Sequence, residues 1–103
     1  MNQFCFAGKV AALPTLSTAP QGWKTGTVLL DVQRPFANGR GDFESDLLPV
    51  EVWRGSAETL AHCVKIGSWI TVRGRVASRM VDSGNGTEIP VLSLVAEKVE
   101  YLH

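Results

Sequence analysis

Arginine and tryptophan side chains alternate with apolar ones between residues 67 and 79. A period of two is typical of a half-buried β-strand, so Ile70, Val72 and Val76 are expected to face a core. The opposite face must meet water or an anion, because a strand cannot bury several unpaired arginines. The cations of this face could bind a phosphate backbone, and the aromatic ring beside them could stack on flat bases. A strand face that is merely hydrated would have the same pattern. The residues of this second face are Trp69, Thr71, Arg73, Arg75 and Arg79.

The composition favours one domain with a binding role. The chain has 103 residues and a formal net charge of +0 at pH 7, so a single domain over residues 1–103 is expected. Any electrostatic attraction must then come from local clusters of charge. The sequence contains no nucleophile–histidine–acid set, metal-ligand cluster or phosphate-binding glycine loop. We therefore expect no enzymatic activity, no metal and no cofactor.

Two cysteines and the absence of targeting signals indicate the compartment. Cys5 and Cys63 lie far apart on apolar segments, where a free cysteine behaves as a small buried hydrophobic residue. The sequence shows no signal peptide and no apolar run long enough for a membrane span. A cytoplasmic protein without a membrane partner is expected.

The first strand is expected over Asn2–Val10 and is apolar on both faces. Phe4 and Phe6 share one face, while Cys5 and Ala7 share the other. The pattern is compatible with a central strand of one chain and with a strand that packs against a second subunit.

The remaining elements follow in a simple order. A loop over 14–22 leads to Trp23, which is expected to cover the core, with an exposed stacking group as the alternative. One helix is expected from Gly55 to about Ile66, with Ser56 as its N-cap and Gly67 as its end. Pro35 should end the second strand, and Pro49 should leave one edge of the third strand unpaired. The other expected strands are Thr27–Phe36, Asp46–Trp53, 67–79 and Glu88–Leu102, with a loop over Met80–Thr87.

Three strands, a helix and two further strands form the order of the oligonucleotide-binding barrel, or OB-fold. The predicted fold class is therefore all-β, a five-stranded OB-fold barrel with one α-helix between strands 3 and 4. Ligands of this barrel contact its second and third strands and the loops 1–2 and 4–5.

Several short motifs occur together in an order that is specific. The sequence resembles the bacterial single-stranded DNA-binding protein family over nearly its whole length. The resemblance implies sequence-independent binding of single-stranded DNA in replication, recombination or repair, by a nucleoid-associated homotetramer or homodimer that associates through the first strand. The motifs are Met1-Asn2, Gly8-Lys9-Val10, Arg34-Pro35-Phe36, Val52-Trp53-Arg54, Ala57-Glu58, Lys65-Ile66-Gly67-Ser68, Val72-Arg73-Gly74-Arg75 and Val95-Ala96-Glu97-Lys98-Val99.

The resemblance also suggests which residues contact the nucleic acid. The family's four base-stacking positions fall at Phe36, Leu47, Trp53 and Val81 of this sequence, and only Phe36 and Trp53 offer an aromatic ring. Two lost stacking positions would weaken binding unless other residues replace them. The positions expected to contact nucleic acid are Arg34, Phe36, Leu47, Trp53, Arg54, Arg73, Arg75 and Arg79.

The departures from the family pattern favour a second hypothesis. Similar barrels occur in primosomal proteins, accessory to replication restart, which bind mainly protein partners and tolerate lost aromatic residues. Family members also carry a flexible tail with an acidic tip, and the 103 residues stop directly after the last expected strand, as in a short form without that tail.

Overall fold

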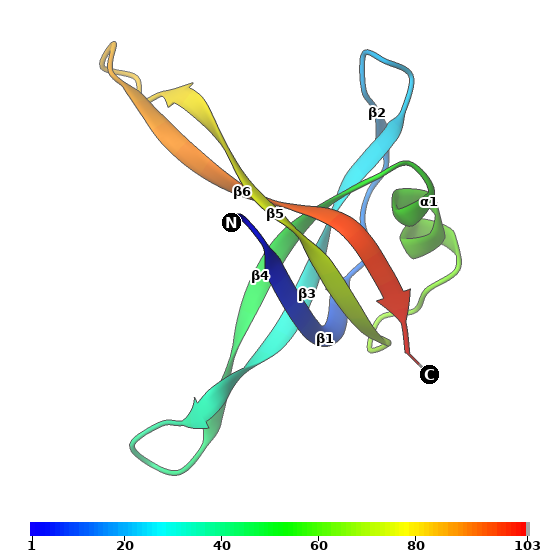
Figure 1. Ribbon diagram of the computed structural model, residues 1–103, viewed down its shortest axis with the longest axis vertical. Coiled ribbons are helices and arrows are strands. Elements are labelled where there is room, and N and C mark those ends of the chain that lie inside the picture. The colour runs from blue at the N-terminus through cyan, green and yellow to red at the C-terminus, as the bar shows by residue number, and fades with distance from the viewer. Residues whose placement is uncertain (103) are drawn as a thin grey trace.

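The computed structural model describes residues 1–102, which contain six strands and one helix (Figure 1). Five of the strands are long and form the barrel, whereas the second strand along the chain has only two residues. In chain order the elements are β1 (Phe4–Ala12), β2 (Ser17–Thr18), β3 (Lys24–Ala37), β4 (Phe43–Trp53), α1 (Arg54–His62), β5 (Trp69–Asp82) and β6 (Glu88–Tyr101).

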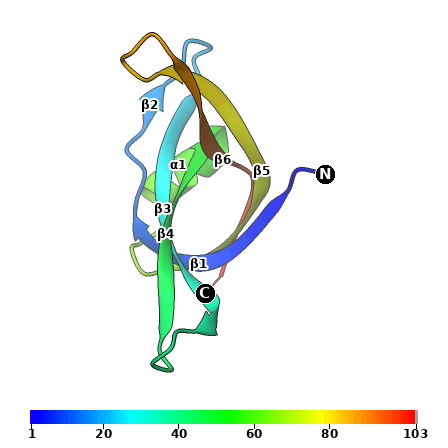
Figure 2. The same ribbon diagram turned by 90° about the vertical axis from the view of Figure 1, so that its left-hand side faces the viewer.

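The first strand closes the sheet into a barrel. The strand order is β1-β5-β6-β4-β3-β2, and β1 also pairs with β3 (Figure 2). Residues Phe4–Lys9 of β1 pair with β5, and Lys9–Ala12 pair with β3. Between β4 and β6 the pairing is parallel and short, with Val50 opposite Leu94. The helix follows the third long strand, so the predicted OB-fold barrel is confirmed.

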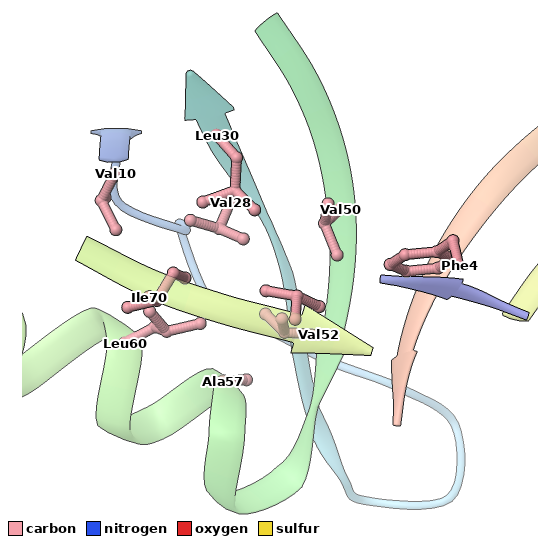
Figure 3. Close-up of a cluster of buried hydrophobic side chains, with 10 residues drawn as sticks. Phe4, Val10, Val28, Leu30, Val50, Val52, Ala57, Leu60 and Ile70 are labelled. Carbon is pink, nitrogen blue, oxygen red and sulfur yellow. The ribbon is translucent and has the colours of Figure 1, made fainter. Parts of the chain in front are cut away.

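A dry apolar core fills the barrel because each strand turns alternate residues inward. Val28 and Leu30 of β3 and Val50 and Val52 of β4 are fully buried. Figure 3 shows Ala57 and Leu60 pointing from the helix into the same cluster. Among residues 1–102 no polar or charged residue is buried. The ionisable groups therefore all lie on the outside of the barrel.

The alternation predicted for residues 67–79 is confirmed. Ile70, Val72 and Gly74 of β5 are buried, whereas Trp69 and the arginines beside them are exposed. Gly74 is needed because a Cβ at this position would overlap the carbonyl oxygen of Val95 on β6. At the same point the pairing of β5 with β6 shifts by a bulge.

Two hairpins extend beyond the barrel as arms, and both are longer than the sequence predicts (Figure 1). The second strand was expected to end at Phe36, but β3 continues to Ala37 because the register shifts between Gln33 and Ala37 and absorbs the proline. Its partner β4 begins at Phe43 rather than at the expected Asp46. The expected loop over 80–87 is shorter, since β5 pairs with β6 as far as Asp82 opposite Glu88. These two pairs of strands are called the β3–β4 arm and the β5–β6 arm.

The helix is shorter than expected and begins earlier. It ends at His62 rather than near Ile66, because Gly67 donates its backbone N–H to the Val10 carbonyl at 2.8 Å and Ser68 accepts from Val10 at 2.9 Å. These hydrogen bonds hold the segment after the helix against β1. The N-cap is Trp53 in extended conformation, without a side-chain hydrogen bond, so the prediction of Ser56 as N-cap was wrong.

Both cysteines are exposed, which contradicts the prediction that they are buried. Cys5 lies on the outer face of β1, which alternation places opposite the core. Cys63 is the residue at the end of the helix, beyond the buried turn that Leu60 belongs to. Their thiols are free rather than joined.

No helix within residues 1–102 is long and apolar enough to cross a membrane. Over the same residues, no three His, Cys, Asp or Glu side chains are grouped as metal ligands would be.

The close approach at Gly74 leads to a prediction about stability. Gly74→Ala should lower the free energy of unfolding by about 1–3 kcal/mol, because the methyl group must displace the β6 backbone. Urea unfolding followed by circular dichroism measures the difference. Gly39→Ala is the matched control, since a Cβ at position 39 would have no atom within 4 Å. This substitution should change the free energy of unfolding by less than about 0.5 kcal/mol. Equal effects of the two substitutions would contradict the packing argument.

Candidate nucleic-acid interface

A groove of about 550 Å³ crosses the outer surface where β4, β6 and β5 lie side by side. Its walls come from the turn before β3 and from the base of the β5–β6 arm, the two projections at the top of Figure 1. Two tryptophans and three arginines lie among the lining residues. They are Trp23, Trp53, Arg54, Arg75 and Arg79.

Trp53 stands where the groove meets a second hollow beside β3. As the last residue of β4 it continues the outward row of Glu51, and it lies opposite Thr25 of β3. Its indole Nε1–H donates a hydrogen bond of 2.6 Å to Oε1 of Glu51. The ring is half-buried and lines both hollows. This hydrogen bond fixes the orientation of a large flat surface between the two hollows.

The sequence suggested that Trp23 covers the core, but this residue instead lines the groove with 45% of its surface exposed. The guanidinium carbon of Arg54 lies 4.2 Å from the centre of the Trp23 ring, a cation–π contact. Arg54 is 31 positions away in the sequence, so no local pattern predicts the contact. The only available signal was the place of Trp23 just before a strand, which is compatible with either role.

Arg75 and Arg79 reach the groove from the outward face of β5. The alternation of the strand places both side chains on this face, and they remain exposed. Nε of Arg75 is 3.6 Å from a carboxylate oxygen of Glu97, a weak and exposed ion pair. Within residues 1–102 no ion pair is formed by Arg79. Strand β5 therefore presents to the groove one arginine that is partly neutralised and one that is available to an anion.

Arg34 and Phe36 lie away from the groove, on the β3–β4 arm. Nη2 and Nε of Arg34 donate to the two oxygens of Asp46 at 2.8 and 3.0 Å, and Nη1 donates to Glu44 at 2.9 Å. The hydrogen bonds from Arg34 hold the pKa of the Asp46 carboxyl below its usual value, and the same bonds raise the pKa of Arg34. Phe36 is 63% exposed near the end of the arm.

The other predicted positions are dispersed over the outer surface. Leu47 is 61% exposed on β4 and faces Asp31 of β3. Arg73 is exposed on β5 between Cys5 of β1 and Lys98 of β6. The structure thus brings Trp53, Arg54, Arg75 and Arg79 together around one groove. It places Arg34, Phe36, Leu47 and Arg73 outside it.

Comparison with known proteins gives concordant matches. The sequence profile of the Single-strand binding protein family matches residues 1–102. The chain is 38% identical over 102 residues to "Single-stranded DNA-binding protein 3" of Listeria innocua, covering 99% of this chain and 64% of that protein. It is 34% identical to the "Single-stranded DNA-binding protein" of Halalkalibacterium halodurans, covering 99% of this chain and 61% of that protein. This chain is therefore shorter than the curated relatives it matches.

One solved structure supports the fold. A deletion mutant of the single-stranded DNA binding protein from Thermus aquaticus superposes with a TM-score of 0.79 at 22% sequence identity. The match covers 100% of this chain and 51% of the Thermus chain. At this identity the likeness supports the barrel architecture and not the ligand.

The Arg34–Asp46 pair leads to a prediction about pH. A carboxyl whose pKa is lowered in the folded state stabilises the fold above its unfolded pKa of about 3.9, and this stabilisation is lost as the pH falls through the lowered value. Wild type should therefore be more stable than Asp46→Asn at pH 7, and the difference should shrink in acid.

Urea midpoints measured from pH 7 downward test this sign. Glu58→Gln is the control, because Glu58 lies on α1 and forms no ion pair within the described chain. Curves for wild type and Asp46→Asn that stay parallel over the whole range would contradict the role of the pair.

Proposed function

We propose, because the chain belongs to the single-strand binding protein family, that it binds single-stranded DNA without reading the base sequence. The observation that carries the proposal is the groove across β4, β6 and β5, which combines two indole rings with three arginines. In replication, recombination or repair such a protein covers exposed single strands at the nucleoid, in the cytoplasm. The role is binding without catalysis.

The groove suits a single strand better than a duplex. Bases that are not paired can stack on Trp53, whose ring is held by Glu51. Phosphates can lie against Arg75 and Arg79 of β5, which is separated from β4 by β6. Stacking makes no distinction between bases, since every base has a π-face. With a formal net charge of +0, attraction to DNA must come from this local cluster.

A longer strand would extend from the groove toward the β3–β4 arm. Phe36 would supply a further ring there, and Leu47 an apolar contact without a π-face. Arg73 would add a cation on β5. Arg34 would have to exchange its hydrogen bonds with Asp46 and Glu44 for a phosphate, so we assign it a smaller contribution than the groove arginines.

Trp53 and salt test the binding proposal directly. Trp53→Ala should weaken binding of oligothymidylate about 5- to 100-fold, because it removes one stacking platform, while Trp53→Phe should retain most of the affinity. If each of the three groove arginines, Arg54, Arg75 and Arg79, contacts one phosphate of a single strand, a plot of log K against log salt concentration should have a slope of about −2. Fluorescence anisotropy of a labelled oligomer measures both quantities.

The outcome also decides between two functions. Binding that is absent, or that neither salt nor Trp53→Ala affects, would contradict the DNA proposal. It would favour a replication-restart accessory protein, the alternative that the non-aromatic Leu47 and the neutralised Arg34 support. Capture of a replication-restart helicase in the absence of nucleic acid would then be the next measurement.

We further propose that copies of the chain associate through β1, as a homodimer or homotetramer. Strand β3 pairs only with residues 9–12 of β1, so Phe4 to Gly8 have an edge without a partner strand in the described chain. Such an edge can pair with a strand from another chain. The outer face along this edge carries exposed Cys5 and Ala7, which are small enough to pack closely.

A charge on this face should break the association. Ala7→Glu is expected to lower the mass measured by light scattering toward that of one chain, because the carboxylate cannot be buried without a partner. Ile66→Glu, at a loop position that is 66% exposed, is the control and should leave the mass unchanged. A wild-type protein that stays monomeric at high concentration would contradict the proposal.

A further inference from the structure

Arg54 has a backbone conformation that L-amino acids avoid. Its φ is 60°, and within residues 1–102 every other residue with positive φ is a glycine. A Cβ in this left-handed region approaches the neighbouring carbonyl too closely. Residues held in such conformations cluster at functional sites, where the surrounding structure over-determines them.

The strained backbone places Arg54 against the groove. It follows Trp53, which is still extended at φ −132°, and it begins the helix, so the chain changes direction within one residue. The guanidinium comes to lie 4.2 Å from the centre of the Trp23 ring. Trp53 and Trp23 are near each other as well, since Thr25, two residues after Trp23, is the partner of Trp53 in the β3–β4 pairing.

Trp23 is too exposed for a purely structural contact. With 45% of its surface open and its side chain in the groove wall, it packs poorly as a cover for the core. Guanidinium groups stay charged while they stack on aromatic rings, and they can bind phosphate at the same time. The pair thus has a flat surface for a base and a charge for the adjacent phosphate.

We propose that Trp23 and Arg54 form a second stacking subsite, next to Trp53, that holds one unpaired nucleotide. The inference rests on the proposed function and deepens it. Leu47 offers no ring at one end of the outward row of β4, and the subsite supplies an additional ring at the other end of that row, beside Trp53. An incoming strand would place consecutive bases against the two indole rings and its phosphates toward Arg54, Arg75 and Arg79.

Variants with a single tryptophan test the stacking itself. Trp53→Phe with Trp69→Phe leaves Trp23 as the reporter, and Trp23→Phe with Trp53→Phe leaves Trp69. Trp69 is a matched control, because it is 44% exposed with Lys9 Nζ 5.5 Å from its ring centre, yet lies outside the groove lining. Oligothymidylate should quench Trp23 and leave Trp69 unchanged. Bound oligomer, detected by anisotropy, without quenching of Trp23 would overturn the subsite.

Affinities provide a second and independent measurement. Trp23→Ala should weaken binding of oligothymidylate about 5- to 100-fold, and Trp23→Phe should restore most of the loss. Trp69→Ala should change the affinity less than twofold. If wild type binds and Trp53→Ala weakens binding but Trp23→Ala does not, the subsite is overturned while the proposed function stands. If wild type does not bind, both fail.

Arg54→Gly separates binding from folding. Glycine adopts positive φ without strain, so the urea midpoint should not fall below that of wild type. The magnitude of the salt slope should decrease by about 0.7, since one phosphate contact to a single strand is lost. A lowered midpoint with unchanged affinity and slope would mean that Arg54 only supports the fold, and would overturn its part in the subsite.

Discussion

Residues 70–74 of β5 are held on both edges, by β1 on one side and β6 on the other, and this double pairing governs the rest of the structure. A strand fixed on both edges cannot rotate, so its alternate residues are committed to opposite faces. Ile70 and Val72 close the core, and the arginines between and beyond them must stand outside. The cationic surface is thus a consequence of the same alternation that makes the interior dry.

Acidic residues accompany the cations of the outer surface. Glu51 accepts from the Trp53 indole, Glu97 lies 3.6 Å from Arg75, and two carboxylates hold Arg34. Exposed pairs of this kind contribute little to stability, but they orient side chains and lower the local positive potential. A bound phosphate would replace one weak partner with another.

The sequence predicted what depends on neighbouring residues and missed what depends on distant ones. The alternation in β5, the order of the strands and the fold class follow from local periodicity and turn residues. The contact between Arg54 and Trp23 and the hydrogen bonds from Arg34 to Glu44 and Asp46 depend on strand register, which periodicity does not fix. The helix ends early because Gly67 pairs with Val10, a residue 57 positions away. Four of the eight predicted contact residues line one groove, and the other four need the path of a bound strand to connect them.

The pairing of β1 also determines when the barrel can form during synthesis. The hairpins β3–β4 and β5–β6 connect strands that are close in sequence, but Phe4 pairs with Gly74. At roughly 5–20 residues per second, Phe4 is synthesised roughly 4–14 s before Gly74, its partner on β5. Phe4 and Phe6, which stack with ring centres 4.8 Å apart in the folded chain, are exposed to water during this interval. The strand that closes the barrel is therefore also the nascent segment that waits longest for its partner.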